Sequence, residues 1–137
     1  MLRAERGRQF PVSIVMIDVD GMKEANDRFG HSAGDELLRR TARLLTAGFR
    51  AEDVVARVGG DEFAVLLPAT DEAAATAITR RVAARVTAWN NAHADAPISL
   101  SMGVAVAAVG QPLLTAWKEA DQRMYKDKHA RKQERKP

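Results

Sequence analysis

Two short apolar runs, residues 54–58 and 63–67, flank a segment that begins with Gly59-Gly60. Runs of this length that are rich in branched residues are typical of strands, and a glycine pair between two of them predicts a β-hairpin. A two-residue type I′ turn needs positive φ at both central positions, which glycine adopts without steric cost. We therefore expect Gly59-Gly60 to form a tight hairpin turn within an antiparallel sheet.

The rest of the chain alternates between strand-like and helix-like patterns. Residues 12–17 form a nearly continuous apolar run, as in a strand buried on both faces, and residues 98–106 alternate between large and small side chains. Apolar residues at helical spacing predict helices that begin near Ser32, Thr70 and Pro112. The order strand, helix, hairpin, helix, strand, helix indicates an α+β fold, with helices packed on one face of an antiparallel or mixed sheet.

Local signals support two of these helix starts. Ser32 and Asp35 have the spacing of a capping box. Thr70 is followed by two acidic residues, which favour the first turn of a helix. The polar stretch that ends at Gly30-His31 is interpreted as a loop.

The composition indicates one globular domain. The 137 residues are 46% hydrophobic and 28% charged, both ordinary values. The absence of cysteine excludes disulfides and thiolate metal sites, and it suits a reducing cytoplasm. No apolar run approaches the roughly 20 residues of a membrane span. We expect no membrane insertion by this segment and a cytoplasmic location, although a longer parent protein could be membrane-anchored.

The net charge of +3 is modest, and much of the basic excess lies in residues 126–137. This basic C-terminal tail has no interleaved aromatic residues on which bases could stack. Nucleic acid is therefore not an expected partner.

Four acidic residues follow predicted strands: Asp18 and Asp20 after the first, and Asp61 and Glu62 after the glycine pair. Neighbouring strands lie about 4.8 Å apart, so these carboxylates would converge if the hairpin lies beside the first strand. Carboxylates this close repel one another, and Mg²⁺ would relieve the repulsion while binding substrate phosphates. Any one of the four could be a simple turn residue, but together they favour a metal and phosphate site.

Several blocks of the sequence resemble, in order and spacing, the GGDEF family of diguanylate cyclases. The matching blocks are Asp18-Val19-Asp20-Gly21-Met22-Lys23, Asn26-Asp27, Gly30-His31, Gly34-Asp35, Arg57-Val58-Gly59-Gly60-Asp61-Glu62-Phe63, residues 99–105, Ala120-Asp121 and Met124-Tyr125. The resemblance implies a single GGDEF domain over residues 1–137. It also implies a ferredoxin-like palm of the nucleotide-cyclase and polymerase type, with a mostly antiparallel sheet flanked by helices and the GGDEF motif on a β-hairpin.

The resemblance implies an activity as well. A diguanylate cyclase condenses two GTP molecules into cyclic di-GMP and releases pyrophosphate, and a homodimer is needed because each domain binds one GTP. Mg²⁺ or Mn²⁺ would be the cofactor, with two ions per half-site. A sensory or receiver domain is expected on the N-terminal side in the parent protein. The alternative is a non-catalytic receptor for GTP or cyclic di-GMP, but the intact motif favours the enzyme.

The resemblance also implies roles for individual residues. Asp61 and Glu62 would be catalytic, with Glu62 activating the ribose 3′-hydroxyl. The metal ligands would be Asp18, the carbonyl of Val19, Asp61 and Glu62. The substrate-binding residues would be Asn26 and Asp35 at the guanine edge, with Gly21, Met22, Lys23, Gly60, Lys128 and Lys132 at the phosphates. Asn26 could instead be a turn residue, and Asp35 could be a helix cap.

Arg50 and Asp53 match the family's RxxD inhibitory site, at which cyclic di-GMP binds back to the enzyme. Arg81, or less readily Arg80, would be the accompanying arginine. The alternative is a surface Arg–Asp pair that contributes little.

The chain departs from the family pattern at both ends. Members usually begin with a helix and a turn before the first strand. We expect this element either to be absent ahead of the apolar run at residue 12 or to lie outside the sequence given. Near the other end, the usual Ala-Lys-x-x-Gly-Arg-Asn reads Asp127-Lys128-His129-Ala130-Arg131-Lys132-Gln133. Lys132 keeps the charge of the family arginine but not its planar fork, so we expect a somewhat lower affinity for GTP.

Overall fold

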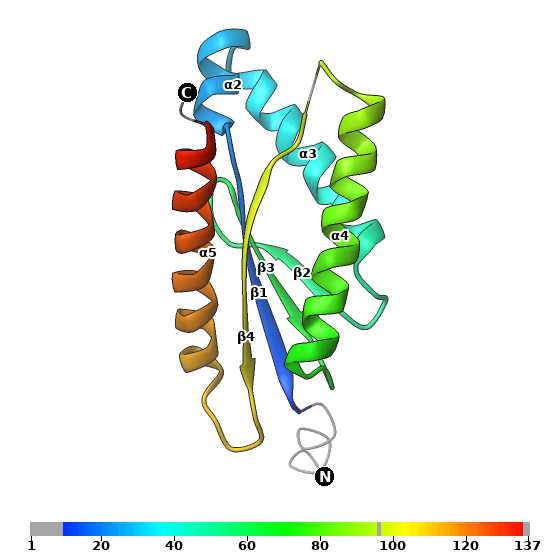
Figure 1. The fold of residues 1–137 in the computed structure, drawn as a ribbon, viewed down its shortest axis with the longest axis vertical. Helices are drawn as coiled ribbons and strands as arrows, with labels where there is room; N and C mark the ends of the chain where they lie inside the picture. The colour runs from blue at the N-terminus through cyan, green and yellow to red at the C-terminus, as the bar shows by residue number, and fades with distance from the viewer. Residues whose placement is uncertain (1–9, 96, 136–137) are drawn as a thin grey trace.

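The computed structural model describes residues 10–95 and 97–135. The elements in chain order are β1 (Val12–Val19), α2 (Met22–Phe29), α3 (His31–Gly48), β2 (Val54–Arg57), β3 (Glu62–Leu67), α4 (Glu72–Ala92), β4 (Leu100–Ala107) and α5 (Leu113–Arg135). The strand order is β2-β3-β1-β4, and every neighbouring pair is antiparallel. This is the ferredoxin-like arrangement, so the expected α+β palm is confirmed (Figure 1).

Helices cover both faces of the sheet, which corrects the expectation of helices on one face. In Figure 1, α3 and α4 lie on one side of the strands and α5 lies on the other. On β1, Val15 and Ile17 belong to the core beneath α3 and α4, whereas Ile14 and Met16 belong to the core beneath α5. The two cores explain why the first strand is apolar on both faces.

The small-residue face of β4 packs closely against α5. A Cβ atom added to Gly103 would lie 2.2 Å from the Ala120 carbonyl oxygen and 2.2 Å from the Met124 nitrogen. No side chain other than hydrogen fits there unless the helix moves away. Glycine at this position therefore sets the distance between α5 and the sheet.

Polar side chains of α5 also bond to the exposed edge of β4. The Asp127 carboxylate accepts the Met102 N–H at 2.9 Å, and the Arg123 guanidinium donates to the Val104 carbonyl. An unpaired edge strand is prone to pair with other chains, so a covering helix also protects it.

The hairpin of β2 and β3 forms as expected, but its glycine pair does not make a type I′ turn. Residues 58–61 connect the two strands, and neither Gly59 nor Gly60 has positive φ. The Arg57 side chain donates to the Gly59 carbonyl at 3.2 Å and to the Gly60 carbonyl at 2.8 Å. A wider loop held by an arginine therefore replaces the tight turn.

The polar stretch after β1 is largely helical, which corrects its interpretation as a loop. α2 begins after Gly21, whose φ of 81° is in the left-handed region that favours glycine. The next helix has Gly30 as its N-cap and no side-chain cap. The capping box of Ser32 and Asp35 is therefore wrong.

The start of α4 is one residue later than expected. Its N-cap is Asp71, whose side chain accepts the Ala74 N–H at 2.9 Å. Thr70 is buried, and its N–H donates to the Pro11 carbonyl at 2.7 Å. Thr70 thus joins the loop before α4 to the chain just ahead of β1.

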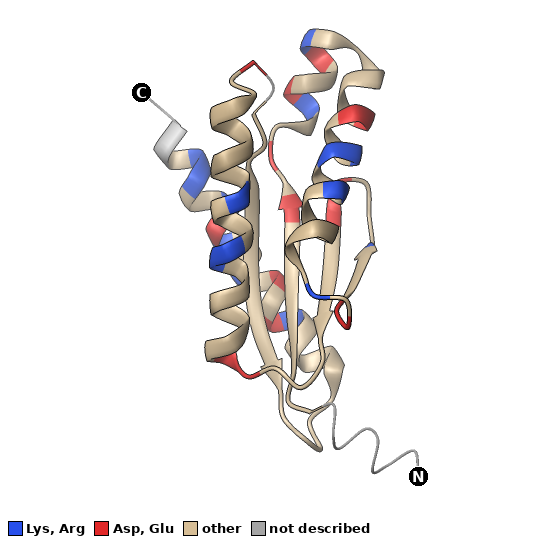
Figure 2. Ribbon diagram, turned by 90° about the vertical axis from the view of Figure 1, so that its right-hand side faces the viewer, with Lys and Arg blue, Asp and Glu red and all other residues tan. Residues whose placement is uncertain are grey.

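Charged residues lie mainly on the helices and at one end of the sheet. In Figure 2 the strands are tan along most of their length and turn red where β1 ends. α5 continues to Arg135, so most of the expected basic tail is helical. Within residues 10–95 and 97–135, no helix is long and apolar enough to cross a bilayer. The expectation about the family's N-terminal helix and turn concerns the chain ahead of residue 10, which lies outside the described residues.

Candidate active site

Three acidic side chains converge where β1 ends and β3 begins. Carboxylate oxygens of Asp18, Asp61 and Glu62 all lie within 4.8 Å of one another. Asp18 and Glu62 are direct partners across the β1–β3 pair, and the Val19 N–H donates to the Asp61 carbonyl at 2.8 Å. The strand register therefore brings together these residues of the predicted metal and catalytic set.

Asp20 does not join this group of three, contrary to the convergence of four acids expected from the sequence. Its carboxylate accepts the hydroxyl groups of Ser99 and Ser101, each at 2.9 Å. β1 ends at Val19, so the alternation that would place Asp20 on the same side as Asp18 does not extend that far. Asp20 instead ties the end of β1 to the start of β4.

A lysine from α5 lies against the carboxylates. Lys128 Nζ donates to Asp18 Oδ2 at 2.9 Å, and the Asp18 side chain is only 6% exposed. Among the described residues, Asp18 Oδ1 is buried and has no hydrogen-bond partner. A buried carboxylate oxygen without a partner is costly, and a cation bound between Asp18 and Asp61 would remove that cost.

The surroundings raise the pKa of two of these carboxyl groups. For both Asp18 and Glu62 the main cause is burial away from water. The hydrogen bond from Lys128 opposes the increase in the pKa of Asp18, and the charge of Asp121 adds to the increase in the pKa of Glu62. A raised pKa makes Glu62 a better acceptor for a proton at neutral pH.

The site suits a hard divalent cation. Its donors are carboxylate oxygens, which Mg²⁺ and Mn²⁺ prefer, and one of those oxygens is buried without a partner. Lys128 donates a hydrogen bond to Asp18, and this bond is the main cause of the raised pKa of Lys128. Asp18, Asp61 and Glu62 therefore form a group that would stabilise such an ion.

The residues expected at the phosphates lie at the start of α2, on α5 and in the hairpin loop. No side chain caps the first turn of α2 after Gly21, so the amides that follow can face an anion. Met22 is half-buried, and Lys23 is exposed on the same helix. Lys132 is exposed one turn beyond Lys128 on α5.

Gly60 is exposed in the hairpin loop, and a Cβ atom there would meet nothing within 4 Å. The backbone at Gly60 is therefore accessible, as a residue beside bound phosphates requires.

The two residues expected at the guanine edge lie on successive helices. Asn26 Oδ1 on α2 accepts the Gly34 N–H at 2.9 Å, and Asp35 is exposed on α3. A Cβ atom on Gly34 would lie 2.3 Å from Asn26 Oδ1. The orientation of Asn26 therefore depends on the absence of a side chain at position 34.

Gly34→Ala is expected to displace Asn26 and weaken GTP binding about tenfold, the scale of one lost polar contact to a substrate. Alanine favours a helix over glycine, so α3 itself should not be weakened. The dissociation constant for GTP, measured with Ca²⁺ in place of Mg²⁺ to suppress turnover, checks this result. Asn26→Ala is the matched comparison, and Gly34→Ala should add little in that background. If Gly34→Ala leaves the GTP affinity unchanged, the orientation of Asn26 does not contribute to nucleotide binding.

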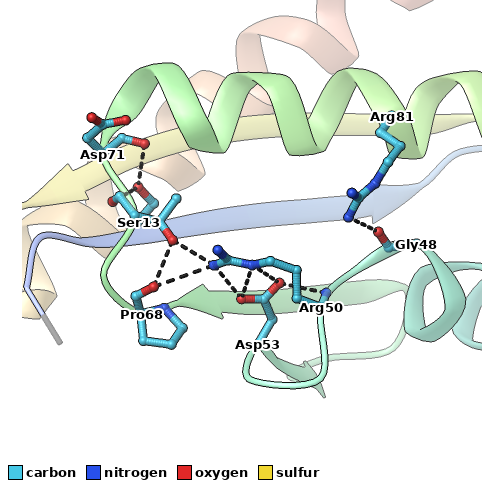
Figure 3. Close-up of polar contacts among 8 residues, drawn as sticks. Ser13, Gly48, Arg50, Asp53, Pro68, Asp71 and Arg81 are labelled. Carbon is cyan, nitrogen blue, oxygen red and sulfur yellow. Dashed lines mark hydrogen bonds and ion pairs between the residues drawn. The ribbon is translucent and has the colours of Figure 1, made fainter.

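The two RxxD residues, Arg50 and Asp53, are hydrogen-bonded to each other. Arg50 Nη2 donates to Asp53 Oδ1 at 2.8 Å, and the Arg50 N–H donates to Asp53 Oδ2 at 2.8 Å. The Asp53 side chain is fully buried, with 0% exposed, and the guanidinium also donates to Thr70 Oγ1 at 2.6 Å (Figure 3). The pair links the loop before β2 to the loop after β3, so it closes the base of the hairpin that carries the GGDEF motif.

Arg81 approaches this network from α4 without joining it. Its guanidinium donates to the Gly48 carbonyl at 2.8 Å, at the end of α3. Figure 3 shows the Arg81 side chain reaching from α4 toward Gly48, and within the described residues no direct bond connects it to Arg50 or Asp53.

One large cavity of the domain does not contain the carboxylate group. It has a volume of about 790 Å³ and is bounded by α2, α3, α4, the start of β4 and Arg131. Asp20 and Gly21 line it, whereas Asp18, Asp61 and Glu62 do not. The chemistry of the carboxylate group, and not the presence of a cavity, therefore identifies the candidate catalytic centre.

A ferredoxin-like sheet with acidic side chains at the end of β1 and on the neighbouring hairpin is the palm architecture of nucleotide cyclases and polymerases. The family model described as diguanylate cyclase, GGDEF domain, matches residues 1–134. The chain therefore belongs to the GGDEF family of diguanylate cyclases.

Individual relatives agree with this assignment. The response regulator PleD of Caulobacter vibrioides is 37% identical over 123 residues, which are 86% of this chain and 27% of PleD. The active GGEEF domain of a diguanylate cyclase from Vibrio cholerae is 32% identical, with a TM-score of 0.78 over 94% of this chain and 83% of that one. A microbial GGDEF domain with a described mode of interaction with cyclic di-GMP is 31% identical, with a TM-score of 0.75 over 94% and 82% of the two chains.

Proposed function

We propose that this domain condenses two GTP molecules into cyclic di-GMP. The observation that carries the proposal is the convergence of Asp18, Asp61 and Glu62 within 4.8 Å, beside an intact GGDEF motif. In each of two equivalent steps, the 3′-oxygen of one GTP forms a bond to the α-phosphorus of the other. The bond to the bridging oxygen breaks, and pyrophosphate leaves.

The chain's own residues would divide the work. Glu62 would accept the proton of the attacking 3′-hydroxyl, which its raised pKa favours. Asp18, Asp61 and the Val19 carbonyl would hold two Mg²⁺ or Mn²⁺ ions, together with Glu62. Bound ions of this kind neutralise phosphate charge and lower the pKa of a coordinated hydroxyl.

A second group of residues would bind and orient GTP. Asp35 would accept hydrogen bonds from the N1–H and N2 amine of guanine, a pattern that adenine cannot supply, and Asn26 would bond to the same edge. The backbone amides of Gly21 and Met22 would bind the triphosphate. They would be joined there by Gly60 and by the side chains of Lys23, Lys128 and Lys132.

Two domains must face each other, because each contributes one GTP. The rate of cyclic di-GMP formation per mole of protein is therefore expected to rise with protein concentration until the dimer saturates. Initial rates measured from nanomolar to tens of micromolar protein check this. A constant rate per mole down to the lowest concentration would contradict the two-domain mechanism.

We infer that cyclic di-GMP inhibits the enzyme at Arg50, Asp53 and Arg81. Guanidinium groups suit phosphate and guanine edges, and a related GGDEF domain that interacts with cyclic di-GMP supports product binding by a domain of this kind. Arg50 is a poor test residue, because its removal would leave the buried Asp53 carboxylate unpaired. Among the described residues, Arg81 donates to a backbone carbonyl, that of Gly48, and it can be replaced at lower cost.

Arg81→Ala is expected to raise the cyclic di-GMP concentration that halves activity about tenfold, as expected for one lost charged contact. The initial rate without product should stay near that of the wild type. The matched control is Arg80→Ala, which removes the adjacent exposed arginine. Equal inhibition of wild type and Arg81→Ala, or the larger effect in Arg80→Ala, would count against this placement.

The remaining proposals concern the parent protein. The chain spans 27% of PleD, a response regulator, and we propose a sensory or receiver domain on the N-terminal side. A cytoplasmic location would give access to GTP and Mg²⁺. A receptor without catalysis has less support, because the Gly59–Phe63 motif is intact.

A further inference from the structure

One side chain, Asp127, ties the later turns of α5 to the sheet. Its Oδ2 atom accepts the Met102 N–H at 2.9 Å and the Arg131 Nε–H at 3.2 Å. Met102 follows Ser101, which is the β4 residue directly opposite Asp18. Asp127 therefore fixes α5 to β4 next to Ser101, the β4 residue that pairs with Asp18.

Lys128 is the next residue on α5, and its Nζ atom reaches Asp18 Oδ2 at 2.9 Å. A lysine side chain is long and flexible, so a fixed backbone beside it is needed to hold its ammonium group in one place. The Asp127–Arg131 ion pair is too exposed to fix the helix by itself, with 34% and 40% of the side chains accessible. The bond to the edge-strand amide supplies the anchor.

The bond between Lys128 and Asp18 has a consequence for metal binding. A divalent cation at Asp18 would lie close to the ammonium group, and like charges at that distance repel. Lys128 therefore competes with the cation when no nucleotide is present. Once a cation is bound, the same ammonium group is available for the triphosphate.

We propose that Asp127 is a positioning residue, which acts through Lys128 by holding it at Asp18 and aiming it at the triphosphate of GTP. The part that concerns GTP rests on the proposed function. The competition between Lys128 and the cation does not, so each part can fail separately.

Asp127→Ala is expected to change two affinities in opposite directions. Mn²⁺ should bind the nucleotide-free chain about threefold more tightly, because a mobile Lys128 competes less well. The α,β-methylene analogue of GTP, with Mg²⁺ present, should bind about tenfold more weakly, because Lys128 is no longer oriented toward the phosphates. General damage to the fold would weaken both, so the opposite signs identify positioning.

Two further variants sharpen the test. Asp127→Asn keeps an oxygen that can accept the Met102 N–H, and it should restore most of the wild-type behaviour. Arg123→Ala removes a different α5–β4 bond, to the Val104 carbonyl, and should leave both affinities unchanged. Thermal unfolding of each variant verifies that the full chain remains folded.

Titration calorimetry with the GTP analogue and electron paramagnetic resonance of free Mn²⁺ measure the two affinities. Unchanged Mn²⁺ binding in Asp127→Ala, or a parallel loss of both affinities, would overturn the positioning role. If Asp127→Ala binds Mn²⁺ more tightly and the wild-type chain makes no cyclic di-GMP, the competition between Lys128 and the cation is supported and the proposed function is rejected.

Discussion

Glu62→Gln is expected to lower the rate of cyclic di-GMP formation about 1,000-fold, within the range that a general base contributes. An amide can neither accept the proton of the 3′-hydroxyl nor carry the negative charge that attracts a metal ion. Asp18 and Asp61 remain in place, so nucleotide should still bind. Glu119→Gln is the control, because it makes the same chemical change at an exposed position of α5.

The same variant should not be less stable than the wild type. The pKa of Glu62 is raised in the folded domain, so the folded state binds the proton more tightly than the unfolded state. Its contribution to stability is therefore present at low pH and is lost as the pH rises through the raised pKa. Glutamine removes this loss, so in metal-free buffer the melting temperature of Glu62→Gln at pH 7 should equal or exceed that of the wild type. A lower melting temperature, or activity within tenfold of wild type, would contradict the role given to Glu62.

Gly103→Ala is expected to destabilise the domain by about 3 kcal/mol, at the upper end of typical overpacking costs. The new methyl group would lie 2.2 Å from backbone atoms at Ala120 and Met124, and backbone cannot rotate away as a side chain can. Relief requires α5 to move off β4. Because α5 carries Lys128, GTP affinity should fall as well.

Urea unfolding measures the free-energy change, and the melting temperature should drop by about 10 °C for a domain of this size. Gly59→Ala is the stability control, since its new Cβ atom would meet its nearest neighbour, Glu62 Cβ, at an ordinary 3.8 Å. A Gly103→Ala domain that melts within one or two degrees of the wild type would show that helix and strand are less tightly packed than described.

The sequence predicts the strands because they depend on short-range patterns, whereas the predicted convergence of four acids depended on the hairpin lying beside β1, and three of the four converge. The apolar run of β1 and the paired runs of the hairpin fix the strands, and the register then places Asp18 opposite Glu62. The type I′ turn was wrong because Arg57 holds a wider loop through the Gly59 and Gly60 carbonyls. The Arg57 side chain lies outside the turn, so the turn propensity of the two glycines does not include its bonds to their carbonyls.

Other features depend on contacts between distant residues. The spacing of apolar residues predicts α5, but it does not show that α5 covers the opposite face of the sheet from α3 and α4. The Lys128–Asp18 pair, 110 residues apart, follows only from that placement. The bond from Arg50 to Thr70 likewise requires two loops to meet at the base of the hairpin. The sequence contains one local signal for α2, the glycine directly before Met22, which marks where the helix begins.

The product formed from GTP and Mg²⁺ by the full chain at micromolar concentration, identified by mass after chromatography, tests the proposed function most directly. We predict cyclic di-GMP and two equivalents of pyrophosphate, with neither formed when Mg²⁺ is removed by a chelator. A folded chain that binds GTP and Mn²⁺ but yields no cyclic di-GMP at any concentration would contradict the assignment of this site to catalysis.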